Sequence, residues 1–496
     1  MAYTPPGVTV QEYSEQVVST LLAAPASICL VGRAQGYQTR TDAVTLSGTT
    51  AVTLPGIPST AVLTSGSIVS VMDAVSPGLA PEGYVSATDY VFNAGAKTIA
   101  RNSAGLIPSG NTVYVTYRYT PADYYQPIRL TNMADIQNRF GNAYNDAGTA
   151  INSRLTYAAE LAFENGAVDL TLLPFFYNNS GVRQEPTDVQ AAAASNWAEN
   201  FVALRDLPGV NIIVPVLGQA DPSVGDSNQL NVIQALQDHI KFMNTEQQYI
   251  VGIVGEDSSA SSSVAQKATM INHAGVIAGR YGGDIAEQMV MMSPSKFTRS
   301  VPTISGGTLT VGGQYMAAAI AGMIAGRTVS SSLTRKLVSG FASVADLRTK
   351  ADKNADAAAG LTVIEQRGLS IVVRHGITLN TTGGTAKSEI SVVRAKHRVV
   401  ESVRETLESQ IIGQVVADGQ APIAVQMAVI NVLDQLRSAD DIVSFQNVQA
   451  RALSSDPTVI EVRFAYRPAF PVNYIDVGFS LDLTSGTTTP QTTQVG

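Results

Sequence analysis

Residues 458–484, TVIEVRFAYRPAFPVNYIDVGFSLDLT, contain the two alternating patterns from which the rest of the chain can be understood. Large apolar residues occupy every second position over 460–466 and again over 475–483. A period of two over this length indicates half-buried β-strands. Pro468 and Pro471 separate the two strands, since neither proline can donate a ladder hydrogen bond. The sequence that follows, SGTTTPQTTQVG, has no apolar period. The second strand is therefore predicted to lie beside a loose terminus, where it could pair with another chain.

A shorter alternation opens the chain in MAYTPPGVTVQEY. Val8 and Val10 alternate with polar residues, and the preceding Pro-Pro-Gly favours an extended backbone. This start lacks the basic and apolar regions of a signal peptide, so Sec-dependent secretion is not expected. No run in the chain approaches the roughly 18 apolar residues that span a membrane.

The composition limits the classes of function. At 496 residues, the chain is expected to form about three domains. Charged residues make up only 15% of it, against about 25% in typical soluble proteins, so much of the surface must be uncharged or buried against other subunits. The net charge of -8 argues against a broad nucleic-acid-binding surface. The single cysteine, Cys29, is predicted to be a core residue and allows no intrachain disulfide, which fits a reducing cytoplasm.

The order of patterns predicts a multidomain α/β and α+β protein. Residues 41–120 read as short strands between Pro, Gly and Ser turns, typical of an inserted all-β sandwich or barrel. Residues 121–344 alternate apolar strands with helices, which predicts a central α/β domain with a mostly parallel sheet. Residues 23–40 are predicted to join 345–473 in an inner α+β domain, completed by the N-terminal segment. Residues 1–22 and 474–496 are predicted to be terminal arms.

Within these domains, some elements can be placed more closely. Residues 127–141 predict a strand, a cap at Thr131 or Asn132, a short helix and a glycine stop. Residues 390–409 are predicted to begin as a strand and become a helix. Further helices and strands are predicted at 422–438, 442–453 and 458–466.

The motifs of known catalytic sites are missing from the sequence. No GxxxxGK[ST] loop, no GxGxxG after a strand and no GxSxG elbow occurs. The four histidines show no metal-ligand spacing with one another or with Cys29. No catalytic, cofactor-binding or metal-binding residue is therefore assigned, and Asp440-Asp441 is interpreted as a solvated turn. An α/β enzyme with an appended β domain stays as an alternative, which would require a convergent polar cluster in a crevice at the strand ends.

One basic run stands out, containing Arg394, Lys396, Arg398 and Arg404. One interpretation is a solvated helix face with pairs three or four residues apart. The other is a docking face for an acidic partner.

Four stretches taken together resemble the contractile tail sheath family of bacteriophages and related injection machines. They are PPGVTVQEY, QPIRLTNMADIQNRFG (126–141), ISVVRAKHRVVESVRETLES (390–409) and the double strand of 458–484. Their order and spacing cover nearly the whole chain. The 41–120 insertion is a variable part of such proteins and could be a surface decoration.

The resemblance implies a structural protein with neither enzymatic activity nor a cofactor. Such subunits form hexameric rings, stacked as a helix around a tail tube, and contract to drive the tube through the host envelope for genome delivery. The implied partners are other copies of the chain, the tail tube protein, and the baseplate and tail terminator proteins, without direct nucleic-acid binding or membrane insertion. The implied location is the virion tail sheath, assembled in the host cytoplasm. A tailocin or an extracellular contractile injection system is the alternative setting.

The resemblance also implies which residues join subunits. The N-terminal arm is centred on Val8, Val10 and Tyr13. The residues of the C-terminal arm are Ile475, Val477, Phe479, Leu481 and Leu483. The helix considered for facing the tube is 394–408, with Arg394, Lys396, Arg398 and Arg404, or else 422–438.

Overall fold

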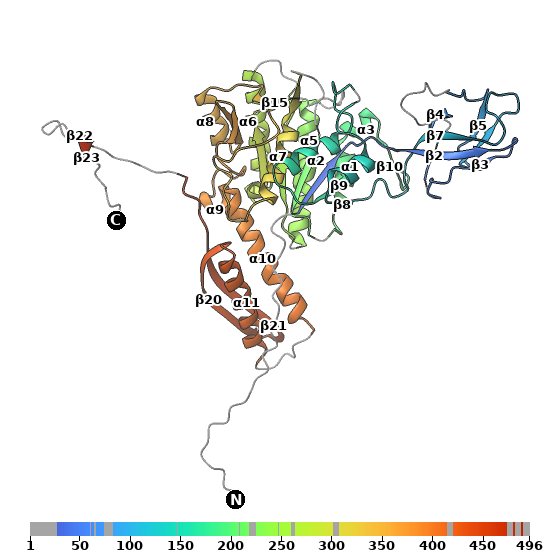
Figure 1. Ribbon diagram of the computed structural model, residues 1–496. Helices are drawn as coiled ribbons and strands as arrows, with labels where there is room; N and C mark the ends of the chain where they lie inside the picture. Colours follow the sequence, from blue (N-terminus) through green and yellow to red (C-terminus); the bar gives the residue numbers. More distant parts are fainter. Residues whose placement is uncertain are drawn as a thin grey trace, which may run out of the picture.

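The computed structural model describes residues 27–473, together with 480–481 and 488–489. It leaves out 60, 64–65, 74–82, 146, 208, 218–224, 247, 259–262, 301–306 and 414–419. Its described parts form an α/β body, an all-β insertion on one side of the body, and a module of two helices and a hairpin that projects from it (Figure 1). The predicted N-terminal arm, with Val8, Val10 and Tyr13, lies outside the described residues. So do Ile475, Val477, Phe479 and Leu483 of the C-terminal arm.

An eight-stranded sheet forms the centre of the body, in the order β19-β18-β14-β13-β12-β1-β9-β8. Its inner strands pair in parallel, whereas the edge strands β8 and β19 are antiparallel. Every residue of β1, β9, β12, β13 and β14 is buried, as expected of a sheet covered on both faces. The strands are β1 (Ile28–Gly32), β8 (Ile128–Leu130), β9 (Leu170–Pro174), β12 (Ile212–Val216), β13 (Val251–Val254), β14 (Met289–Ser293), β18 (Thr362–Arg367) and β19 (Ser370–Val373).

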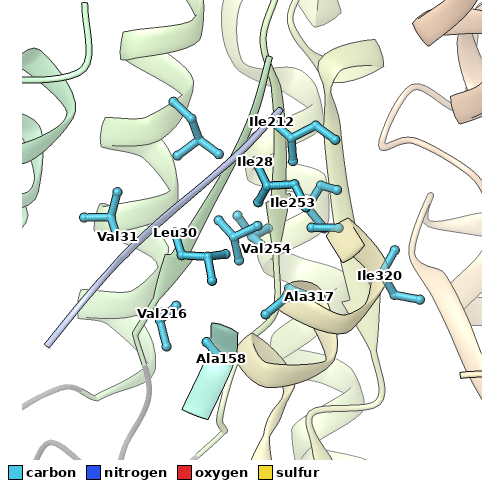
Figure 2. Packing of buried hydrophobic residues seen from close by; sticks show 14 of the residues in the cluster. Ile28, Leu30, Val31, Ala158, Ile212, Val216, Ile253, Val254, Ala317 and Ile320 are labelled. Atoms are coloured by element: carbon cyan, nitrogen blue, oxygen red, sulfur yellow. The ribbon is translucent and has the colours of Figure 1, made fainter. Parts of the chain in front are cut away.

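Two helices pack closely against this sheet and against each other. α7 (Gly313–Ala325) is buried along nearly its whole length, and α2 (Arg154–Glu164) lies against it. Ile28 and Leu30 of β1 lie on the side of Ala158 and Ala317, from α2 and α7, whereas Val31 points to the other side of the strand (Figure 2). Alanines on both helices, together with Gly322 of α7, let the two backbones approach closely.

Further helices and small sheets complete the body, and the long helices α5 and α6 contribute to its core. Its other α-helices are α1 (Met133–Phe140), α3 (Asp188–Ala192), α4 (Ala194–Val202), α5 (Asp226–Thr245), α6 (Ser263–Gly279), α8 (Lys350–Ala358) and α9 (Thr385–Ser388), with 3-10 turns at Arg280–Gly283 and Ala286–Gln288. Its small sheets contain β10 (Tyr177–Asn179), β11 (Val182–Gln184), β15 (Lys296–Ser300), β16 (Thr308–Gly312) and β17 (Ser343–Val344). Ser480–Leu481 (β22) pairs with Thr488–Thr489 (β23), so Leu481 of the predicted arm lies in a short strand.

The insertion is all-β, as the sequence predicts, and contains two three-stranded sheets with a core of their own. The first sheet has the order β2-β7-β4 and the second β3-β6-β5. Asp42 is buried there and accepts hydrogen bonds from the Tyr117 hydroxyl at 2.7 Å and the Gly56 N–H at 2.8 Å. The strands are β2 (Gln38–Leu46), β3 (Val52–Thr53), β4 (Ile68–Met72), β5 (Tyr90–Asn93), β6 (Thr98–Arg101) and β7 (Asn111–Tyr119).

The step predicted at 127–141 is confirmed in detail. The Asn132 side chain caps α1 by accepting from the Asp135 N–H at 2.9 Å, and Gly141 ends the helix with a positive φ of 85°. A glycine tolerates this left-handed conformation without the steric cost that a side chain brings.

Two expectations differ from the structure. The predicted strand start of 390–409 is wrong, because α10 (Ile390–Gln410) is helical throughout. The first residues of α10 are apolar because that end of the helix is buried, and not because they alternate along a strand. In addition, the inner domain predicted from 23–40 and 345–473 is not separate from the α/β domain in this part of the chain, because β1, β18 and β19 all belong to the sheet of the α/β body.

The contact between α2 and α7 yields a stability test. A Cβ at Gly322 would lie 2.1 Å from the Ala162 carbonyl oxygen, a backbone atom that cannot rotate away. We expect Gly322→Ala to lower the free energy of unfolding by about 1–3 kcal/mol, measured by chemical denaturation. The matched control is Gly275→Ala on α6, where no atom lies within 4 Å of the added carbon. That change should stabilise by about 0.5–1 kcal/mol. Equal effects of the two substitutions would contradict the close-packing account.

Candidate functional site

The helix–hairpin module consists of α10, α11 (Ala421–Ser438), β20 (Ile442–Leu453) and β21 (Asp456–Pro468). It projects from the body, and α10 links the two (Figure 1). With 21 residues, α10 is about 32 Å long. Ile390 near its start belongs to the core of the body, whereas Val399 and Val403 belong to the core of the module. One continuous helix therefore joins two separate hydrophobic cores.

The core of the module is small and is built from periodic apolar residues of both helices. Partly buried side chains of the hairpin, including Phe445, Val462, Phe464 and Tyr466, pack against it. The alternation of 460–466 is thus confirmed as the helix-facing side of a half-buried strand. The fully buried members are Val399, Val403, Val429, Val432, Leu433, Leu436 and Ile442.

The register of the hairpin shifts at three places, and the middle one is a β-bulge. The register shifts between Gln446 and Gln449, and Asn447 has a positive φ of 56°. The Gln426 side chain of α11 donates a hydrogen bond of 2.8 Å to the Val448 carbonyl within the bulge. Bulges bend a strand and increase its twist, so α11 holds the hairpin in a curved shape.

The hairpin is a sheet of only two strands. Within the described residues, neither β20 nor β21 pairs with a further strand at its outer edge. On the face turned away from the helices, Glu461 accepts from Arg451 at 2.6 Å and from Arg463 at 2.5 Å, and these bonds lower the pKa of Glu461. Unpaired strand edges are templates for another chain, and two strands alone are marginally stable. The module therefore presents an incomplete sheet.

Charged and aromatic side chains fasten α10 at the joint between body and module. The Nε atom of Arg398 lies 2.6 Å from the Oδ2 atom of Asp441, and both side chains are almost fully buried. His397 stacks on Tyr249 with the ring centroids 5.1 Å apart. The interpretation of Asp441 as part of a solvated turn is wrong, because this carboxylate is only 2% exposed. Its burial raises the pKa of Asp441, while the guanidinium of Arg398 lowers it.

The four basic residues considered for the tube have different surroundings. Arg394 is 6% exposed, and burial lowers the pKa of its guanidinium to about 10. Lys396 forms an ion pair with Glu287, and Arg404 lies 3.7 Å from Glu408 on the helix surface. Some of these basic residues therefore stabilise the joint between body and module. The choice of tube-facing residues stays a prediction.

Glu401, also at this joint, carries a carboxyl group with a strongly raised pKa. It lines a small cavity together with Arg394, His397 and Arg398, next to the starts of β12 and β13. Desolvation raises the pKa of Glu401 to about 7, opposed mainly by the charge of Arg404.

Other buried titratable groups among the described residues include pairs and single side chains. His273 Nδ1 lies 2.6 Å from Glu256 Oε1 in a buried pair, and burial lowers the pKa of His239 to about 4. Cys29 is fully buried, which confirms it as a core residue. In the part of the chain that the structure describes, no three His, Cys, Asp or Glu side chains are grouped so as to hold a metal ion. The described helices also include none that is long and apolar enough to cross a membrane.

Comparison with known proteins identifies the family. No family model matches the chain. Over 418 residues, however, it is 32% identical to the tail sheath protein of Mycobacterium phage Bxz1. The chain belongs to the tail sheath protein family. The matched region covers 80% of this sheath protein and 66% of its phage relative, just under two thirds of that protein's length. Because tail sheath proteins are structural, the α/β-enzyme alternative is set aside.

Solved structures show the same fold across almost the whole sheath protein. The contracted helical sheath of the anti-feeding prophage has a chain with a TM-score of 0.55 and 13% identity, covering 97% of this chain and 100% of that one. A chain of the six-fold symmetrised baseplate of the same particle gives 0.54 at 13% identity, with the same coverage. The contracted sheath complex of the PVC extracellular contractile injection system gives 0.53 at 12% identity, covering 97% and 99%.

Sequence reasoning found the strands of the module but missed the residues that fix its joint. Asp441, Tyr249 and Gln426 act through contacts with residues far away in the sequence. One signal was available for Asp441, because an acid directly before an apolar strand can be the buried partner of one of the arginines at 394–404.

The raised pKa of Glu401 predicts a pH-dependent stability. A carboxyl whose pKa is higher in the folded than in the unfolded state binds extra protons on folding, so stability falls as pH rises from about 4.5 to about 7. We expect Glu401→Gln to raise the stability of the protein at pH 8 by about 1–2 kcal/mol and to flatten its pH dependence, measured by urea unfolding from pH 5 to pH 8. Glu246→Gln, an exposed glutamate at the end of α5 in the body, should keep the wild-type profile. An unchanged profile in the Glu401 variant would contradict the assignment.

Proposed function

We propose that this protein polymerises as stacked hexameric rings around a tail tube, and that its contraction drives the tube through a cell envelope to deliver a genome. The observation that carries the proposal is the incomplete two-stranded sheet of the module in a chain of the tail sheath family. Such a sheet offers main-chain donors and acceptors to strands of neighbouring copies.

Strand addition explains how weakly charged subunits can be joined. Main-chain hydrogen bonds supply affinity, and alternate apolar side chains fill pockets on the receiving subunit. When such a contact is heterologous and does not close on itself, it produces a helical filament. The 12-residue β20 and the 13-residue β21 give each neighbouring strand a long edge for pairing.

The arms are the strands proposed to add to this sheet. By their sequence patterns, the N-terminal arm uses Val8, Val10 and Tyr13, and the C-terminal arm uses Ile475, Val477, Phe479, Leu481 and Leu483. Before the second arm starts, Asn473 Nδ2 donates a hydrogen bond of 3.3 Å to Glu389 Oε2, directly ahead of α10. The C-terminal arm thus departs from the joint between body and module.

The proposed domain roles follow from this arrangement. The module forms the inner part of the sheath, with Arg394, Lys396, Arg398 and Arg404 as candidates for tube contact, and the β insertion decorates the body. The extended sheath is metastable and is released by the baseplate, without nucleotide hydrolysis. The further partners are the tube and tail terminator proteins, and assembly takes place in the host cytoplasm.

A second setting is a tailocin or an extracellular contractile injection system. It is favoured by the likeness of the fold to sheath chains of the anti-feeding prophage and of the PVC system. The subunit mechanics would be the same. Capsid and terminase genes beside the gene for this chain would favour a phage, and their absence would favour the other setting.

Removal of either arm tests the proposal. We expect the purified full-length chain to form rings or tubes in negative-stain electron microscopy. Chains lacking 1–22 or 474–496 should stay as single subunits, because the incoming strand is lost. Circular dichroism should still show a folded α/β body. Normal tubes from both truncated chains would contradict the role of the arms.

A pair of neighbouring substitutions tests the alternation within the C-terminal arm. Phe479→Asp places a charge in the apolar series and should abolish tubes, because a charged side chain cannot be buried without a partner. Ser480→Asp adds the same charge at the next position, in the polar series, and should leave assembly intact. Sedimentation of assembled material measures both variants, and equal loss of assembly would argue against strand addition.

A further inference from the structure

A polar cleft opens where the β insertion joins the body. Its volume is about 450 Å³, within the range of small-molecule sites. One wall is the start of β2 with Arg118 of β7, and the other is the exposed side of α1 and the loop after it. The elements that line the cleft, β2, β7 and α1, lie on the side of the insertion, away from the helix–hairpin module (Figure 1).

The lining of this cleft has an unusual chemistry. Seven of its eleven residues are asparagine or glutamine, and no aspartate or glutamate is among them. A primary amide offers two N–H donors and a carbonyl acceptor in one plane, which matches the hydroxyl group as donor and acceptor. The absence of carboxylates from the lining disfavours a metal cation, and the scarcity of apolar side chains disfavours a hydrophobic ligand.

Several of these amide side chains have hydrogen-bond donors and acceptors that are not used within the part of the chain that the structure describes. Within the described residues, no hydrogen bond involves the side chains of Gln38, Gln137, Asn138 or Asn142, all of which line the cleft. By contrast, Asn145 uses its side chain to accept from the backbone N–H groups of its own loop. The first four are therefore free to bind a ligand, whereas Asn145 shapes the wall.

The floor of the cleft is fixed. Asn152 Nδ2 donates to Gln35 Oε1 at 3.2 Å, and the Gln35 N–H donates to the Phe140 carbonyl at 3.1 Å. Gly141 has a positive φ, and a Cβ there would meet the Gln35 side chain. The close approach of Gln35 to the end of α1 thus depends on this glycine.

One aromatic ring completes the lining. The Tyr37 ring lies under the guanidinium of Arg118, whose Cζ is 4.5 Å from the ring centroid. Both residues line the cleft, so they supply it with aromatic carbon and with guanidinium N–H donors. Sugar rings combine C–H faces with hydroxyl edges, so they suit a lining that offers an aromatic ring among amides.

We propose that this cleft binds a neutral saccharide, of one to a few pyranose units. None of its lining residues belongs to the module through which subunits are proposed to join. The site gives the protein a carbohydrate-binding capacity that is separate from assembly, and it does not depend on the proposed contraction.

Saturation-transfer NMR on the full-length protein tests the site. The probes are glucose, galactose, mannose and N-acetylglucosamine, with maltose, lactose and chitobiose as disaccharides. We expect transfer to at least one sugar, and a dissociation constant about tenfold higher in the Gln137→Ala/Asn138→Ala double variant, because hydrogen bonds to the sugar are lost. Gln184→Ala, an exposed amide outside the cleft, should bind as the wild type does.

Further controls distinguish a saccharide site from an anion site. Asn138→Asp keeps the volume but removes donors, so it should weaken sugar binding even if the double variant folds poorly. Inorganic phosphate and sulfate are tested as competitors. Displacement of sugar by millimolar sulfate would indicate an anion site at Arg118 and overturn the proposal. Absence of transfer to every sugar, or equal binding by the double variant, would overturn it as well.

Discussion

The continuity of α10 across two hydrophobic cores is the constraint on which the rest of the structure depends. Its first turns are buried in the body and its middle turns in the module, so neither unit can rotate without disturbing the helix. The buried pair of Arg398 and Asp441 adds an electrostatic fastening at the joint. A charge left there without its partner would be costly, so the pair favours one arrangement of the helix and the hairpin. The module is thus a rigid extension of the body.

The fixed joint holds the two-stranded hairpin in one orientation, in which its edges can pair with further strands. A two-stranded sheet gains stability when further strands pair with its edges, and the helices can cover only one of its faces. The bulge at Asn447 sets the curvature of that platform, with Gln426 holding the Val448 carbonyl. An added strand would meet a surface whose shape is already fixed, which reduces the entropy lost on binding.

Elements that a local sequence pattern specifies were predicted correctly. Features that depend on contacts between distant parts of the chain were not. The alternation of 460–466 and the cap, helix and glycine of 127–141 are local, and both were found. The start of α10 was misread because its Ile and Val residues also suit a strand, and only burial against the body decides for a helix. Asp441 was misread because Arg398, its partner, is 43 positions away. The fully apolar Ile28–Gly32 could have been placed in the parallel sheet, since it lacks the alternation of a half-exposed strand. The module that carries the proposed function was largely predictable, whereas the joint that orients it and the amide cleft required the tertiary structure.

The stem of the β insertion has a further consequence. The chain enters and leaves the insertion at one point, where the Thr120 hydroxyl donates a hydrogen bond of 2.8 Å to the Gly36 carbonyl. Because the insertion has its own core, its size and content can change while the path of the body stays the same. The stem is therefore a suitable position for replacing the insertion with another domain. In an array of many identical subunits, a foreign domain fused between these two residues would be displayed once per subunit, at a spacing set by the array.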